Sequence, residues 1–265
     1  MASSRIITLT TDFGVADHFV GTMKGVILGI FPEAKIVDLC NSVGSFDVLD
    51  GAMTLAQAYS YYPPDTIHLV VVDPGVGSAR RPLLVATSRH YFMAPDNGVL
   101  SLVMEKEERI AVRHITSEHY FLQPVSNTFH GRDVFAPCAA WMAKGVEPEK
   151  FGEEITDYVR FAIPKPKQVA ERAVKGVVLK TDRFGNLITN FTPENAPYVF
   201  ADGAQVKISV GQAVAAYLST NYAQGKPGEC FAMLNSMGYL EIACNRGSAS
   251  HLAHAGRGAE VTVEF

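Results

Sequence analysis

The sequence has few of the features that mark several classes of protein. It contains four cysteines in 265 residues, and none forms a C-x-x-C pair, so neither a zinc knuckle nor a disulfide framework is indicated. Lysine and arginine total 23 against 27 aspartates and glutamates, which gives a formal charge of −4 and no basic surplus for a nucleic-acid backbone. No apolar run approaches the roughly 18 residues of a membrane span. We therefore expect reduced, mostly buried thiols and neither a nucleic-acid nor a membrane partner.

The amino-terminal residues lack the pattern of a secretory signal. Residues 1–5 lead directly into an apolar segment, without a basic region, an apolar core and a small-residue cleavage site. We expect a cytoplasmic protein. The chain length predicts one large domain or two smaller ones, and 48% hydrophobic residues suffice for a buried core.

The first part of the chain alternates between strand-like and helix-like segments. Residues 67–72 (IHLVVV) are nearly all apolar, as expected for a strand covered on both faces of a parallel sheet. The sequence therefore predicts an α/β domain over residues 1–165 with a largely parallel sheet. Its expected strands are 6–11, 35–39, 67–72, 82–87 and 91–94, and its expected helices are 19–30, 47–61 and 99–105.

A proline-punctuated, charged connector at 163–168 ends this alternation. Beyond it the helical spacing gives way to short β-rich runs, which predict a smaller all-β domain, a barrel or a sandwich, over residues 170–265. The expected strands are 174–180, 187–191, 205–210, 231–234, 239–243 and 261–265.

Two acidic loops follow predicted strands of the first domain. In open α/β sheets, ligands bind outside the carboxyl ends of the strands. Asp12 follows the first strand, with Asp17 beyond it, and Asp73 follows the third strand in a glycine-rich loop that ends at Arg81. An ionised carboxylate offers acceptors for the two hydroxyls of a ribose, but an aspartate at this place is equally compatible with a helix cap.

These loops do not match two familiar nucleotide-binding signatures. Residues 12–14 read Asp-Phe-Gly, as in protein kinases, but no glycine-rich loop or lysine-bearing strand precedes them. The run from Gly75 to Arg80 lacks the third glycine of a dinucleotide fingerprint, and the chain has no P-loop. The kinase and Rossmann interpretations are excluded.

Two further polar segments are compatible with a site. His130 lies in the run 127–137, and a histidine there fits either a structural core position or a catalytic group that titrates near neutral pH. Residues 182–186 have the composition of a hairpin turn. Within that turn Phe184 has a ring to stack on a base, and Asn186 has an amide to read the base edge.

Taken together, these motifs carry a resemblance that none of them carries alone. The sequence closely resembles the S-adenosyl-L-methionine (SAM) hydrolases that form adenosine, also called SAM hydroxide adenosyltransferases, whose relatives include the SAM-dependent fluorinase and chlorinase. The matching segments span almost the whole chain in order: Thr11–Gly14, Val72–Arg81, Ala94–Gly98, Phe129–Asp133, Asp182–Asn186 and Leu234–Ala243.

The resemblance implies a fold, an assembly and a reaction. It implies an amino-terminal α/β domain, a carboxy-terminal β-barrel, and a homotrimer whose active sites lie between one subunit's first domain and its neighbour's second. The family's catalytic triad maps onto Asp73, Arg80 and His130. Because the halogenating relatives have lost this triad, the resemblance favours water as the nucleophile and hydrolysis of SAM to adenosine and L-methionine. SAM is then the substrate, and neither a cofactor nor a metal is expected.

The resemblance also implies a set of substrate contacts. Asp12 would hold the ribose diol, Phe46 and Phe184 would form apolar walls, and Asn186 would lie at the adenine edge. The remaining contacts fall on Asp17, Asp182, Ser236, Met237 and Glu241, with Asp17, Ser236 and Glu241 toward the ammonium or carboxylate of methionine. A Glu241 side chain that points into the barrel wall would not fit this role.

Two alternatives stay open at this point. One is a halide-using SAM adenosyltransferase of the chlorinase type, which the intact triad and the absence of fluorinase's extra loop after the third strand disfavour. The other is a non-catalytic sensor of SAM or adenosine, in which Asp73, Arg80 and His130 form only a structural ion-paired cluster.

Overall fold

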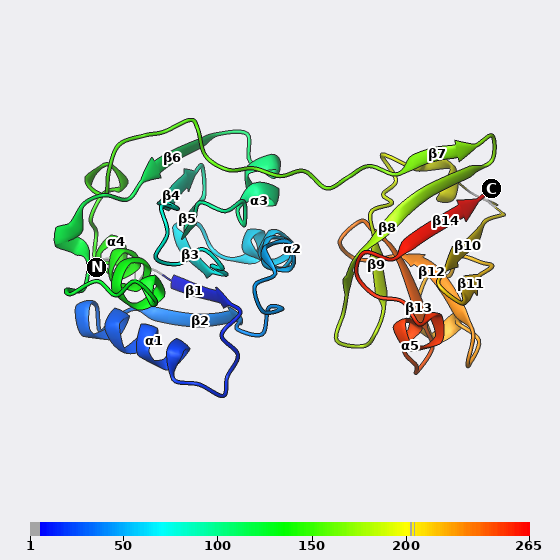
Figure 1. The fold of residues 1–265 in the computed structure, drawn as a ribbon, viewed down its shortest axis with the longest axis horizontal. Coiled ribbons are helices and arrows are strands. Elements are labelled where there is room, and N and C mark those ends of the chain that lie inside the picture. The colour runs from blue at the N-terminus through cyan, green and yellow to red at the C-terminus, as the bar shows by residue number, and fades with distance from the viewer. Residues whose placement is uncertain (1–5, 202, 204) are drawn as a thin grey trace. The chain divides into compact units, whose positions relative to one another are not determined.

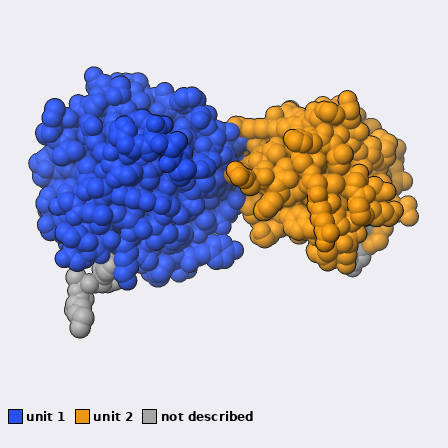
Figure 2. All heavy atoms as spheres, turned by 90° about the horizontal axis from the view of Figure 1, so that it is seen from below, with its two compact units in different colours: residues 1–162 blue, residues 163–265 orange. Residues whose placement is uncertain are grey.

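The computed structural model describes residues 6–201, 203 and 205–265. The chain forms two compact units, residues 1–162 and 163–265 (Figure 2). Residues 1–5 of the predicted first domain lie outside the described residues. Each unit has a hydrophobic core of its own.

The first unit is built on a six-stranded sheet with the order β2-β1-β3-β5-β4-β6 (Figure 1). Strands β2, β1, β3 and β5 are parallel, whereas β4 runs antiparallel to both of its neighbours. The prediction of a largely parallel sheet is therefore confirmed. The strands are β1 (Ile6–Thr11), β2 (Lys35–Cys40), β3 (Thr66–Val71), β4 (Pro82–Thr87), β5 (His90–Pro95) and β6 (Ile110–His114).

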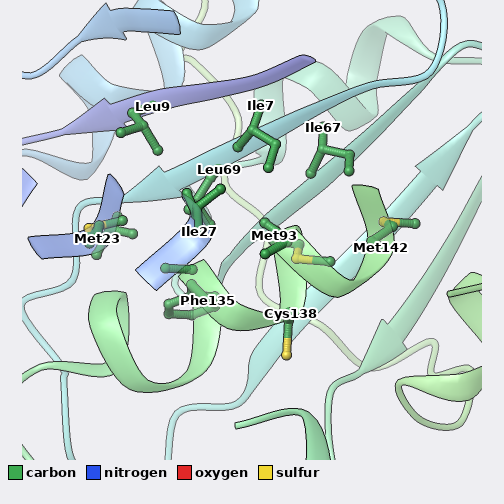
Figure 3. Close-up of a cluster of buried hydrophobic side chains, with 14 of the residues drawn as sticks. Ile7, Leu9, Met23, Ile27, Ile67, Leu69, Met93, Phe135, Cys138 and Met142 are labelled. Atoms are coloured by element: carbon green, nitrogen blue, oxygen red, sulfur yellow. The ribbon is translucent and has the colours of Figure 1, made fainter. Parts of the chain in front are cut away.

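Helices cover both faces of this sheet. Helices α1 (Phe19–Ile30) and α4 (Ala136–Ala143) pack against one face, and α2 (Val48–Ala58) packs against the other with α3 (Ser101–Lys106) beside it. Successive side chains of a strand point to opposite faces, so Ile7 and Leu9 enter the core under α1 and α4 (Figure 3). Single helical turns lie at Tyr59–Tyr61, Glu118–Tyr120 and Pro148–Lys150, and a π-helical turn at Gly131–Phe135 leads into α4.

The second unit is an antiparallel sheet with the order β11-β10-β14-β8-β9-β13-β12, and β7 pairs with β8. Because β11 also contacts β12, the sheet curls into a nearly closed barrel, which confirms the predicted all-β fold. The strands are β7 (Lys167–Ala170), β8 (Ala173–Thr181), β9 (Leu187–Thr189), β10 (Lys207–Val210), β11 (Ala213–Ala215), β12 (Cys230–Leu234), β13 (Leu240–Cys244) and β14 (Glu260–Glu264). Helix α5 (Ala249–Ala253) and single turns at Pro197–Val199 and Tyr222–Gln224 complete the unit.

Most predicted elements are present within a residue or two of their expected bounds, but some differ. The predicted helix 47–61 is α2 followed by a separate single turn, and the strands β6, β7 and β11 and the helices α4 and α5 were not predicted. All four cysteines are free, and only Cys40 is not fully buried, as expected. Among the described residues, no helix is long and apolar enough to cross a membrane.

Candidate active site

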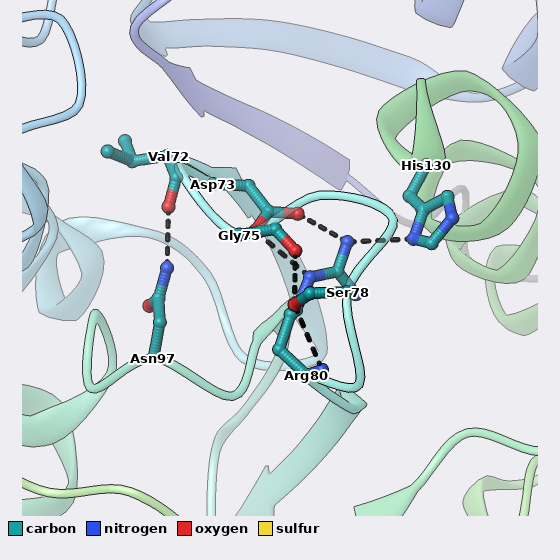
Figure 4. A network of polar contacts seen from close by, with 7 residues as sticks. All are labelled: Val72, Asp73, Gly75, Ser78, Arg80, Asn97 and His130. Atoms are coloured by element: carbon teal, nitrogen blue, oxygen red, sulfur yellow. Dashed lines mark hydrogen bonds and ion pairs between the residues drawn. The ribbon is translucent and has the colours of Figure 1, made fainter. Parts of the chain in front are cut away.

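Three side chains from distant parts of the first unit meet beside the sheet (Figure 4). Asp73 follows β3, Arg80 precedes β4, and His130 precedes the π-helical turn. The Arg80 Nε donates to Asp73 Oδ1 at 2.9 Å, and its Nη2 donates to Asp73 Oδ2. The same Nη2 lies 2.8 Å from His130 Nδ1. The structure therefore brings together the three residues of the predicted triad.

The loop between Asp73 and Arg80 folds back on itself, and this brings the two side chains together. The Ser78 hydroxyl donates to the Gly75 carbonyl at 2.7 Å, and the Arg80 backbone N–H donates to the Ser78 hydroxyl at 3.3 Å. Gly77 has a φ of +76°, which favours glycine, and a Cβ there would lie 2.2 Å from the Asn127 carbonyl oxygen. The close approach at Gly77 therefore places this loop directly against the segment that carries His130.

The contact with Arg80 fixes the protonation pattern of His130. A guanidinium has donors and no acceptor, so His130 Nδ1 must accept, and in the neutral ring the proton sits on Nε2. Burial and the positive charge of Arg80 lower the pKa of His130, while the carboxylates of Asp73 and Asp133 partly offset this. The geometry and the direction of the pKa shift both favour a neutral imidazole with an N–H donor at Nε2.

Arg80 is held as a mostly buried cation. The side chains of Arg80 and Asp73 are 8% and 5% exposed, and Arg80 Cζ lies 5.4 Å from the centre of the Phe135 ring. Arg80 Nη1 is buried and has no hydrogen-bond partner among the described residues, so part of its hydrogen-bonding capacity is unused. A paired cation in such surroundings acts strongly on a nearby anion, because little water screens it.

A pocket of about 420 Å³ opens in the first unit and contains most of its predicted site residues. Asp12, Asp17, Phe46, Asp73 and His130 all line it. The other lining residues are Phe13, Phe19, Ser45, Val71, Val76, Thr128, Phe129 and Gly131.

Asp12 in this pocket does not act as a helix cap. Helix α1 has His18 as its N-cap, whereas Asp12 Oδ2 accepts the backbone N–H of Phe46 at 2.8 Å. Phe46 has a φ of +63°, and its side chain stays 74% exposed. The first acidic loop thus fixes a strained aromatic residue at the pocket, and the alternative of a capping aspartate is wrong here.

The predicted contacts of the second unit lie in two turns of the barrel. The first joins β8 to β9 as a hairpin, as its composition predicted. Asp182 organises it, since its Oδ1 accepts the backbone N–H groups of Phe184 and Asn186 and its Oδ2 accepts the Asn186 amide, each at 2.8 Å. The Phe184 ring is 77% exposed, whereas Asn186 is buried. The turn therefore exposes the aromatic ring of Phe184, and the hydrogen bonds of Asp182 hold its backbone in place.

The second turn lies between β12 and β13 and is organised by Asn235. Its Oδ1 accepts the Met237 backbone N–H at 3.0 Å, and Ser236 is exposed beside it. Glu241 on β13 is only 3% exposed, and its two oxygens accept from the Tyr222 hydroxyl at 2.7 Å and the Asn235 amide at 3.2 Å. Burial raises the pKa of Glu241, and the charge of Asp182 adds to this. These contacts place Glu241 in the barrel wall, where it supports the turn.

Several residues in or beside the pocket were not predicted. Thr128 and Val76 belong to motifs that were recognised, but nothing in their spacing distinguishes a lining residue from a loop residue. Phe135, which stacks under Arg80, lies in an apolar helical run whose pattern shows only burial. Residues 6–201, 203 and 205–265 contain no cluster of three or more histidine, cysteine, aspartate or glutamate side chains placed to hold a metal ion.

Comparison with known proteins identifies the class to which this fold and site belong. Residues 7–152 match the SAM hydroxide adenosyltransferase N-terminal domain, and residues 176–262 match the SAM hydroxide adenosyltransferase C-terminal domain. The chain therefore belongs to the SAM hydroxide adenosyltransferase family.

Individual relatives agree with this assignment. The chain is 34% identical over 255 residues to the (R)-S-adenosyl-L-methionine hydrolase of Methanocaldococcus jannaschii, covering 93% of this chain and 91% of that protein. It is 26% identical to the fluorinase of Nocardia brasiliensis, covering 98% and 96%. The crystal structure of an uncharacterized conserved protein from Thermotoga maritima superposes with a TM-score of 0.90 at 35% identity and covers 98% of this chain and all of that one.

Proposed function

We propose that this protein hydrolyses SAM to adenosine and L-methionine by attack of water at the ribose 5′ carbon. The observation that carries the proposal is the buried Arg80 cation, held by Asp73 and bonded to neutral His130 beside the pocket. Relatives about 34% identical over nearly the whole chain are named (R)-S-adenosyl-L-methionine hydrolases. The epimer in their name defines the form of the substrate that we expect this protein to prefer.

The reaction is a displacement that needs little activation of the leaving group. The C5′–S bond breaks and its electron pair neutralises the sulfonium, so methionine leaves as an uncharged thioether while a C5′–O bond forms. The protein must supply a positioned water that is losing its proton and a site that excludes bulk solvent. Because the substrate already carries the activating charge, we propose that no metal or cofactor takes part.

We propose a division of this work among the three residues that is consistent with their geometry. In our proposal His130 donates its Nε2–H to the attacking water and orients it, since its Nδ1 is occupied by Arg80. Asp73 lines the pocket, and the carboxylate lone pairs that Arg80 leaves free are the proposed acceptors of the water proton. The charge of Arg80 stabilises the developing hydroxide.

The proposed substrate contacts come from residues of both units. Asp12 would bind the ribose hydroxyls and Phe46 would cover them, while Phe184 and Asn186 would hold the adenine. Asp17, Ser236 and Met237 would contact the methionine part, and Asp182 would act by holding the turn of Phe184 and Asn186. We propose that Glu241 acts through the Asn235 turn and does not touch the substrate, because both of its oxygens already accept hydrogen bonds.

We further propose that the protein works in the cytoplasm as a homotrimer in which the second unit of one subunit completes the pocket of its neighbour. The pocket of the first unit holds five of the predicted contacts, whereas the exposed Phe184 and its turn belong to the second unit. We propose that a neighbouring subunit supplies Phe184 and its turn to the pocket.

The proposal is tested by supplying each SAM epimer separately in buffer with neither halide nor metal and analysing the products by chromatography and mass spectrometry. We expect adenosine and methionine, formed faster from the (R) epimer. The Arg80→Ala variant should still bind SAM by calorimetry but form no adenosine. Stoichiometric binding by the wild type without turnover would support a sensor instead, and 5′-chloro-5′-deoxyadenosine on addition of chloride would support a halide-using enzyme.

A further inference from the structure

The mechanism above leaves one fully buried carboxylate without a role. Asp133 lies three residues after His130, and its side chain has no exposed surface. Burying a charge is costly unless it is paired and hydrogen-bonded. The contacts of this side chain show what its burial achieves.

Asp133 holds both ends of the segment that carries His130. Its Oδ2 accepts the backbone N–H of Ser126 at 2.8 Å, and its own backbone N–H donates to the Phe129 carbonyl at 3.1 Å. Arg132 pairs with it in a bidentate manner, with Nε on Oδ1 at 2.6 Å and Nη2 on Oδ2 at 2.9 Å. Asp133 thus ties residues 126–130 into a closed loop, through its carboxylate at Ser126 and through its backbone N–H at Phe129.

This loop carries three contacts of the site. The Asn127 carbonyl lies against Gly77 of the Arg80 loop, and Thr128 and His130 line the pocket. The backbone continues from His130 into the π-helical turn, a distortion that is frequent at functional sites. A shift of Ser126 would therefore move the histidine relative to Arg80.

We propose that Asp133 is a positioning residue for hydrolysis, which fixes the 126–130 loop so that His130 Nδ1 stays on Arg80 and Nε2 faces the water. The inference rests on the proposed function of this site. The negative charge of Asp133 also raises the pKa of His130, against the lowering by burial and Arg80. Asp133 should thus affect both the position of the imidazole and the pH at which it is protonated.

The test compares Asp133→Asn with a matched control, Asp96→Asn. Asp96 is also buried, pairs with Arg81 through Oδ2 at 2.7 and 2.9 Å, and accepts a distant backbone N–H from Val159 at 2.7 Å. It does not line the pocket. Both variants lose a buried ion pair of the same kind, but only one of them lies next to His130.

We expect Asp133→Asn to lower kcat about 10-fold with little change in KM, a smaller loss than the roughly 100-fold that a 1 Å misplacement of a catalytic group can cost. The acid limb of its pH–rate curve should move to lower pH, because the charge that raises the pKa of His130 is gone. Asp96→Asn should leave the limb in place. An unmoved limb in Asp133→Asn, or equal losses in both variants, would overturn the proposal.

Two further measurements keep the test decisive. If Asp133→Asn does not fold, Arg132→Lys replaces it in the test. This variant keeps both charges and breaks the bidentate pair. It should lower kcat about 3-fold without moving the limb, and wild-type kcat in this variant would contradict the proposal. The His130 pKa can also be followed by NMR without substrate, so a failed hydrolysis assay and a failed role for Asp133 are distinguishable.

Discussion

At the scale of single residues, the hydrogen bond at Nδ1 determines which chemical roles are open to His130. Its Nδ1 accepts from Arg80, and a proton there would face a guanidinium that has only donors. The sequence placed His130 in the triad through resemblance but left open whether it orients the water or takes its proton. That choice depends on a contact between residues 50 positions apart, which no local pattern encodes.

The first prediction concerns the pH dependence of hydrolysis. The rate should fall as the pH drops through the pKa of His130, which lies below the ordinary value of about 6.5 because of burial and Arg80. His130→Asn has no group that titrates there, so its kcat should be about 100-fold lower and insensitive to pH over that range. Initial rates from pH 4.5 to 8 check this. A wild-type rate that rises on acidification would mean that protonated His130 is the active form.

The second prediction concerns Gly77. Alanine there adds about 1–2 kcal/mol of backbone strain at its positive φ and a clash with the Asn127 carbonyl. Gly258→Ala is a matched control, since Gly258 has a φ of +82° with nothing within 4 Å of a Cβ. Both variants should lose stability in urea, and only Gly77→Ala should also lose most of its kcat. Equal kcat values in the two variants would show that the close approach does not position His130.

At the scale of elements, strand patterns were the most informative part of the sequence. Apolar runs such as 67–72 predicted the central strands because their residues are buried on both faces. The edge strand β6 has a half-polar sequence that does not by itself predict a strand. Its pairing with β4 holds it in the sheet. The π-helical turn after His130 was not predicted, because it depends on the tertiary contacts of Asp133 and Phe129.

The third prediction concerns two buried histidines, His68 on β3 and His90 on β5. His68 and His90 lie with ring centres 5.3 Å apart, packed against Tyr59, and burial lowers the pKa of both, that of His68 to about 3. In the unfolded chain these rings take up protons below pH about 6.5, whereas in the folded state they do so only at lower pH, so stability falls as the pH drops below about 6.5.

Thermal melts between pH 7.5 and 5 check this prediction. The melting temperature should decrease steadily on acidification, and the decrease should be smaller in His90→Phe, which removes one of the two groups. His251→Asn removes an exposed histidine and should leave the slope unchanged. A melting temperature that does not change with pH in the wild type would contradict the account of this pair.

At the scale of the whole molecule, the sequence alone could not place the two halves of the site. The first unit contains Asp73, Arg80 and His130, and the second contains Phe184 and Asn186. Motif matching assigns residues to a site, but it does not say whether they come from one chain. The trimer therefore enters through resemblance and stays a proposal.

The fourth prediction tests that assembly. Light scattering should give three times the mass of the 28.7 kDa chain. Arg80→Ala and Asn186→Ala subunits, each inactive alone, should recover part of the wild-type rate after mixing and subunit exchange, since some sites then combine two intact halves. An active monomer, or no recovery in a mixture shown to exchange, would contradict a site shared between subunits.

The central claim is that water attacks the 5′ carbon of SAM, and the position of an oxygen label tests it most directly. Wild-type protein would be incubated with SAM in ¹⁸O-labelled water without halide, and the products analysed by mass spectrometry. We expect one labelled oxygen at the 5′ position of adenosine and unlabelled methionine. Unlabelled adenosine, label in methionine, or intact SAM bound to the protein would contradict it.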